Sequence, residues 1–222
     1  MTNKTSIGDI ITASLRENLK PGLVLQALAV TVLLLYYFVP PVRSALEVLG
    51  HWKQEGGFVF SAFSTSFFGG VVPYLLMLFT GRIAPEKQKP LFWFYFIFWM
   101  WKGIEVDLLY RGQAMWYGNS SHWLVVALKV MTDQFIYCPI WAVPTMMIFY
   151  LWKDSGFSVA ELKRKLAEVS FFQRWLRVLI SNILVWVPAV CVVYMLPLSL
   201  QIPLFNLVLV FWTLILASVA EK

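Results

Sequence analysis

The stretch LVVALKVMTDQFIYCPIWAVPTMMIFYLW, residues 124–152, carries only two charged side chains, Lys129 and Asp133. As one helix it would extend about 43 Å, whereas the hydrocarbon core of a bilayer is about 30 Å thick. The stretch therefore predicts a membrane-spanning helix. Its uncharged part, residues 135–152, could almost cross by itself, so we expect Lys129 and Asp133 near the outer interface.

Six apolar blocks occur along the chain: residues 22–41, 58–80, 91–110, 124–152, 178–197 and 204–220. They are continuous rather than alternating, which favours spanning helices over a barrel. Only 14% of the residues are charged, against about 25% in soluble domains. The sequence predicts an all-α polytopic membrane bundle of about six spans, forming a single domain, residues 1–222. Because LSLQIP alone separates the last two blocks, four spans plus a hairpin is the alternative.

Basic residues indicate the orientation. In the six-span arrangement, 13 of the 18 Lys and Arg residues fall on the side of the two termini. Cytoplasmic loops carry such an excess, so we expect both termini inside. A polar N-terminal segment, residues 1–21, precedes the first apolar block, and no small-residue cleavage motif follows that block, so we expect an uncleaved first span. An integral location in a bacterial inner membrane or an organelle membrane (mitochondrial inner or peroxisomal) fits these features. The excess of basic residues in the inside loops also explains the net charge of +6, so we expect no nucleic acid as a partner.

Residues 153–177 predict a basic amphipathic helix on the inner membrane surface. Ser158 followed by Glu161 is typical of a capping box at a helix start. Apolar residues then recur at helical spacing from Leu162 to Phe172, and the lysines and arginines lie off that stripe. A short solvated connector is the alternative.

Small residues in SAFSTSFFGG, residues 61–70, recur every four positions. Ser61, Thr65 and Gly69 form one row, and Gly70 belongs to a second. Small residues at this spacing let helix backbones approach closely in a membrane, so helix packing is the favoured interpretation. A pore lined by hydroxyl groups is the alternative.

Three acid–base pairs have one-turn spacing within the apolar blocks. They are Lys102 with Glu105, Asp107 with Arg111, and Lys129 with Asp133. Pairing on one helix face lowers the cost of burying charge in a membrane. The pairs either hold helices together or line the mouth of a solute pathway; a catalytic role is the least favoured interpretation.

Pro139 and Pro144 follow the third pair. Proline inside a helix removes a hydrogen bond and predicts a kink, whose free carbonyls Gln134 can cap. We expect no enzyme and no cofactor, because the sequence shows no catalytic motif and no metal-ligand cluster. Cys138 and Cys191 lie in apolar segments and are interpreted as small buried side chains.

These motifs resemble the family of the mitochondrial inner-membrane protein Mpv-seventeen and peroxisomal membrane protein twenty-two. The resemblance covers residues 103–217. One element is a lysine, an Asp-Gln pair four residues later, and a proline: Lys129, Asp133, Gln134 and Pro139. The other matching positions are Gly103, Asp107, Tyr110, Gln113, Gly118, Trp186, Pro188, Pro197, Asn206 and Trp212. Gln201, Thr213 and Ala217 stand where the family has arginine, asparagine and serine. The chain is thus similar to a distant branch of the family, with a bacterial origin as one option.

The resemblance implies a membrane protein that forms a weakly selective pore or maintains membrane homeostasis. Together with the buried pairs, it predicts a small channel or solute pathway, with small solutes or ions and the lipid bilayer as partners. A non-conducting scaffold or assembly protein is the alternative. The sequence leaves open whether the protein forms a homo-oligomer.

Overall fold

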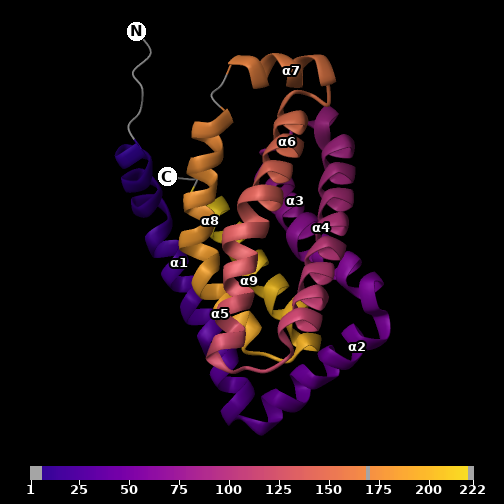
Figure 1. The fold of residues 1–222 in the computed structure, drawn as a ribbon. Helices are drawn as coiled ribbons and strands as arrows, with labels where there is room; N and C mark the ends of the chain where they lie inside the picture. The colour runs from indigo at the N-terminus through magenta and orange to yellow at the C-terminus, as the bar shows by residue number, and fades with distance from the viewer. Residues whose placement is uncertain (1–6, 169–170, 220–222) are drawn as a thin grey trace.

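The computed structural model describes residues 7–168 and 171–219, and every regular element in these ranges is helical. The predicted all-α bundle is confirmed. In chain order the elements are α1 (Ile7–Phe38), α2 (Pro40–Thr65), the π-helical η1 (Ser66–Val71), α3 (Val72–Phe79), the short 3₁₀ turn η2 (Pro85–Lys87), α4 (Gln88–Tyr117), α5 (Trp123–Thr132), the π-helical η3 (Asp133–Ala142), α6 (Val143–Asp154), α7 (Val159–Glu168), α8 (Phe171–Tyr194) and α9 (Leu198–Val219) (Figure 1).

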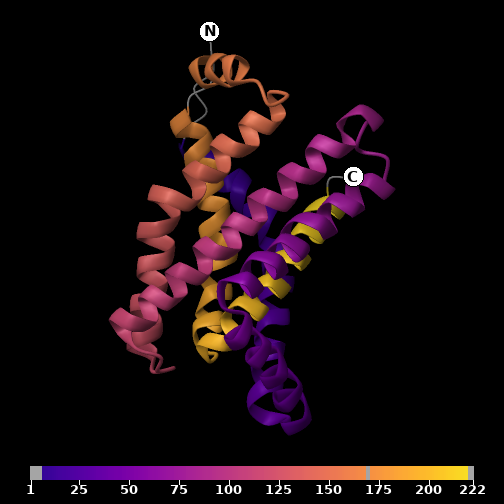
Figure 2. The ribbon, with the colours of Figure 1, turned by 90° about the vertical axis from the view of Figure 1, so that its right-hand side faces the viewer.

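These elements join into long rods. α2 has a kink at Gly57, where φ is 52° and ψ is −128°, and the part of α2 after this kink continues through η1 and α3 as one rod. α5, η3 and α6 form another rod. In the described part of the chain, four helical stretches are long and apolar enough to cross a membrane: Arg16–Phe38, Pro40–Phe79, Trp123–Asp154 and Phe171–Tyr194. Helices α4 and α9 run through the same bundle beside them (Figure 2). The protein is therefore a helical membrane protein, and six crossings remain the prediction for α1, α2–α3, α4, α5–α6, α8 and α9.

Of the predicted polar N-terminal segment, residues 1–6 lie outside the described residues, and residues 7–21 are continuous with the first rod. α1 begins at Ile7 and continues through Pro21 into the apolar block. Asn18 is buried and its Nδ2 donates to Ser181 Oγ of α8 at 3.0 Å. This contact extends the packing of α1 on α8 well before the predicted start of the span at residue 22.

The helix predicted over residues 153–177 is shorter in the structure. α6 ends at Asp154, a turn follows in which Gly156 and Phe157 both have φ of 63°, and α7 covers only Val159–Glu168. Phe172, expected on the same helix, belongs to α8. The Ser158 Oγ accepts a hydrogen bond from the Glu161 backbone N–H at 3.3 Å. At the helix start, a hydrogen bond from Arg164 lowers the pKa of Glu161.

The sequence DQFIYCP forms the start of η3 rather than a break in the rod. Pro139 lies inside this π-helical segment, and Pro144 follows in the first turn of α6. Trp175 Nε1 of α8 donates to the Pro139 carbonyl oxygen at 3.0 Å. The predicted kink thus takes the form of wider helical turns, held by a side chain from a neighbouring helix.

The backbones of α2 and α4 come into close contact at Gly103. A Cβ added at Gly103 would be 2.2 Å from the Ser61 carbonyl oxygen and 2.8 Å from Thr65 Cβ. One turn further, Gly69 and Gly70 of η1 lie against Trp99 of α4. The small residues singled out in residues 61–70 therefore pack against α4, and this contact sets the rotation of both helices.

Candidate functional site

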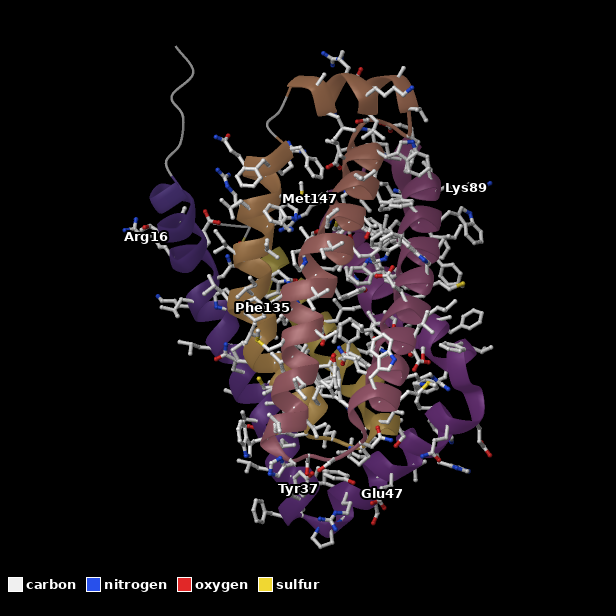
Figure 3. The ribbon with its side chains drawn as sticks, viewed as in Figure 1. Arg16, Tyr37, Glu47, Lys89, Phe135 and Met147 are labelled. Carbon is white, nitrogen blue, oxygen red and sulfur yellow. The ribbon has the colours of Figure 1, made fainter. Side chains whose placement is uncertain are left out.

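Many of the side chains buried most deeply in this bundle are polar. Each of them is at most 4% exposed. They are Lys53, Ser61, Thr65, Ser66, Lys102, Asp107, Gln113, Lys129, Asp133, Gln134, Gln201 and Asn206. Figure 3 shows the side chains over the ribbon, with Phe135 and Met147 marking the rod that contains η3. Charged groups this deep in a membrane bundle are costly and are candidates for function.

Asp107 of α4 is the centre of the first cluster. Its Oδ1 accepts from Arg111 Nε at 3.0 Å, which is the predicted intrahelical pair. Its Oδ2 accepts from Lys53 Nζ at 2.9 Å and from Ser61 Oγ at 2.8 Å, both on α2. The Arg111 guanidinium also lies over the Phe58 ring, 4.6 Å from its centroid. Asp107 therefore joins α2 to α4 through two basic residues.

Lys102 of α4 forms the second cluster. Its Nζ donates to Glu105 Oε1 at 2.8 Å, again a predicted pair, and to Thr145 Oγ1 of α6 at 2.9 Å. The Tyr137 hydroxyl of η3 donates to the same Glu105 oxygen. The ammonium lies 4.7 Å from the centroid of the Trp101 ring. This cluster joins α4 to the α5–α6 rod and leaves Lys102 neutralised.

Asp133, the first residue of η3, forms the third cluster with uncharged donors. Its Oδ2 accepts from the Tyr194 hydroxyl of α8 at 2.6 Å. Its Oδ1 accepts from Gln134 Nε2 at 3.1 Å and from Cys138 Sγ at 3.6 Å. Gln134 Oε1 in turn accepts from Asn182 Nδ2 of α8 at 3.1 Å. Gln134 thus serves Asp133 and α8 instead of capping the carbonyls near Pro139.

The third predicted pair is not formed. Among the described residues, no carboxylate lies within 4.0 Å of Lys129 Nζ, although the side chain is 1% exposed. The ammonium lies 5.8 Å from the centroid of the Tyr194 ring. Asp133 is the first residue of the π-helical segment and turns toward Tyr194. One-turn spacing allowed the pair, but the local helix geometry and the hydroxyl from α8 direct Asp133 elsewhere.

A cavity of about 320 Å³ lies between α4, η3, α6, α8 and α9. Its polar wall holds Lys102, Asp133, Gln134, Tyr137 and Asn182, and the rest of the lining is mostly aromatic and aliphatic. Apolar pockets of about 300–1,000 Å³ with a few polar groups are typical of small-molecule sites. Lys102 and Asp133, two of the charged residues predicted at the mouth of a solute pathway, thus line this cavity, whose wall comes from five elements.

Most of the other residues that carry the family resemblance lie around the cavity and the clusters described above, and three lie within or at the ends of helices. Tyr110 stacks edge-on against Tyr194, and Gln113 Nε2 donates to the Lys129 carbonyl oxygen at 3.1 Å. Asn206 Oδ1 accepts from Thr65 Oγ1 at 2.8 Å. Trp186 and Trp212 line the cavity. Gly118, with φ of 85°, ends α4; Pro188 lies inside α8, and Pro197 immediately precedes α9.

Sequence reasoning missed the partners that come from other helices. Lys53, Tyr194 and Asn182 were not singled out, although each bonds a predicted residue. Lys53 carried a signal, since it is a lysine close to an apolar block. Tyr194 and Asn182 carried none beyond being polar residues in a span.

The fold and this site define a polytopic helical membrane protein with a polar network inside its bundle. Within the described residues, no group of three or more His, Cys, Asp or Glu side chains is placed to hold a metal ion. Comparisons with protein-family models, with curated proteins and with solved structures find no match to the chain.

Proposed function

We propose that the protein is a small, weakly selective channel or solute pathway whose route passes through the cavity beside Asp133. The observation that carries this proposal is the cavity itself, which brings a carboxylate, two amides and a lysine to the interior of a membrane bundle. Ionisable groups are expensive within a membrane and typically mark solute or ion pathways. The resemblance to the Mpv-seventeen family, whose members are proposed to form pores, supports the same function and a role in membrane homeostasis.

Location and partners belong to the same proposal. The connection between α3 and α4, the helix α7 and the start of α1 lie toward one end of the bundle (Figures 1 and 2). This end holds the basic residues Arg16, Lys20, Arg82, Lys87 and Lys163. An inside location of this end, with both termini, follows from the excess of positive charge in cytoplasmic loops. A bacterial inner membrane or an organelle membrane fits, with small solutes or ions as partners and no catalytic step.

A non-conducting scaffold is the second candidate, and one observation favours it. Two of the ion-pair clusters connect different helices. Lys53–Asp107 joins α2 to α4, and Lys102 of α4 contacts Thr145 of α6. Contacts of this kind hold helices in register without any solute. In a scaffold, changes at Asp133 would lower stability and would alter no flux.

Single-channel recording in planar bilayers tests the proposal. We expect discrete conductance steps from the purified wild type and a reduced cation preference in Asp133→Asn, because that change removes a negative charge from the route. Glu47→Gln, at the exposed end of α2, is the matched control and should leave the selectivity unchanged. Electrical silence of well-folded wild-type protein at all voltages would contradict the channel and favour the scaffold.

A further inference from the structure

The two charged side chains that line the cavity, Lys102 and Asp133, differ in whether they have an ionic partner. Lys102 is neutralised by Glu105 at 2.8 Å. Asp133 has only uncharged donors, and among the described residues no Lys or Arg nitrogen lies within 4.0 Å of its carboxylate. Lys129, one turn before it, does not line the cavity. The wall therefore presents one carboxylate that lacks an ionic partner.

Aromatic rings form much of the remaining wall. They come from four helices: Trp99, Tyr110, Tyr150, Trp186, Phe205 and Trp212. The faces of such rings attract cations, and cages of aromatic side chains are the usual means of binding quaternary ammonium groups. The combination of an unpaired carboxylate and an aromatic wall favours a cation and disfavours an anion.

The chemistry of the wall also separates organic from inorganic cations. A metal cation such as Ca²⁺ takes six to eight oxygen ligands. Here the Asp133 oxygens already accept three hydrogen bonds, and Gln134 Oε1 accepts from Asn182. An alkylammonium instead needs only one countercharge and apolar surface.

We propose that the cavity binds a small organic monocation, an alkylammonium. Asp133 is the counter-ion, and the aromatic rings enclose the alkyl groups. The proposal rests on the proposed function in one respect: it names the class of solute for that pathway. Binding itself requires no transport and can be measured separately.

Calorimetric titration of the purified full chain with choline tests this inference. The neutral control ligand is 3,3-dimethylbutan-1-ol, in which carbon replaces the ammonium nitrogen and the shape is preserved. We expect choline to bind about tenfold more tightly or better than the alcohol. Equal binding of the two ligands, or no binding of choline at tens of millimolar, would overturn the proposal, and this comparison needs no variant.

Two variants sharpen the test. Asp133→Asn should abolish the preference for choline over the alcohol, because the countercharge is removed. Tyr194→Phe removes a hydrogen bond from Asp133 but keeps the carboxylate, so the preference should remain. A preference that survives in folded Asp133→Asn would contradict the role of this residue.

Flux in proteoliposomes separates this inference from the channel. Choline binding without choline flux would contradict the solute pathway and leave the binding site standing. Flux of inorganic ions from protein that does not bind choline would support a channel and overturn the assignment of its solute.

Discussion

Lys53 of α2 and Asp107 of α4 form a buried ion pair, with Lys53 Nζ 2.9 Å from Asp107 Oδ2. Their side chains are 4% and 2% exposed. Arg111, on the same helix as Asp107, is a second partner at 3.0 Å but is 38% exposed. The carboxylate thus holds one fully desolvated cation and one that remains in contact with the surroundings, and the two should contribute very differently to stability.

Asp107→Asn is expected to lower the free energy of unfolding by about 3–5 kcal/mol, because it leaves Lys53 buried without an ionic partner. Arg111→Gln should cost about 1 kcal/mol or less, since the Arg111 guanidinium is partly exposed and Asp107 keeps Lys53 as its ionic partner. Unfolding in a denaturing detergent, followed by circular dichroism, measures both. Losses of similar size in the two variants would show that burial does not determine how much each of the two contacts contributes to stability.

Gly103→Ala should destabilise the contact between α2 and α4. Its new Cβ would lie 2.2 Å from the Ser61 carbonyl oxygen, so the helices must separate, at a cost of about 1–3 kcal/mol. Gly112→Ala is the matched control on the same helix, since nothing lies within 4 Å of its added Cβ. The control should be neutral or about 0.5–1 kcal/mol more stable, because alanine favours helix. Unfolding midpoints of the two variants check the contrast.

Lys129→Met is expected to raise the unfolding temperature in detergent. The ammonium is buried and, within the described structure, has no carboxylate partner, so an apolar chain of similar length removes a desolvation cost. If Lys129 and Asp133 formed the pair that their spacing suggests, the same change would destabilise the protein.

A double-mutant cycle separates these two cases. Both side chains contact Tyr194, so the coupling energy between Lys129→Met and Asp133→Asn should be small, about 0.5 kcal/mol, if they do not pair directly. A coupling of 1 kcal/mol or more would show that they pair in solution.

Local spacing predicted the parts of this structure that depend on one helix. The apolar blocks predicted the helical rods, and the one-turn spacings predicted Lys102–Glu105 and Asp107–Arg111. The capping residue Ser158 was found in the same way. Each of these features depends on side chains within four positions of each other, where helix geometry alone sets the distance.

Contacts between helices could not be predicted in this way. The bond from Tyr194 to Asp133 spans 61 positions, and it requires a particular rotation of α8 relative to η3. That rotation follows from packing, as with Gly103 on Ser61, which a single sequence does not reveal. The pair Lys129–Asp133 failed for the same reason, because a contact from another helix competed with the local one.

The number of membrane spans depends on whether α4 crosses the membrane. α4 carries the charged residues Lys89, Lys102, Glu105, Asp107 and Arg111. It is not among the four stretches that are long and apolar enough to cross a membrane. Within the bundle, however, its central charges are paired, which lowers the cost of insertion. We therefore expect α4 and α9 to cross with the other rods, making six spans.

Three variants, each with one added cysteine, distinguish six spans from the four spans α1, α2–α3, α5–α6 and α8. Glu47→Cys, Asn119→Cys and Lys163→Cys place thiols at exposed positions in α2, in the α4–α5 connection and in α7. With six spans, a membrane-impermeant maleimide should reach positions 47 and 119 from one side and position 163 only from the other. With four spans, in which α4 and α9 do not cross, positions 47 and 163 would share a side and position 119 would be opposite. The grouping does not depend on the overall orientation, and the unsubstituted chain controls for labelling of Cys138 and Cys191.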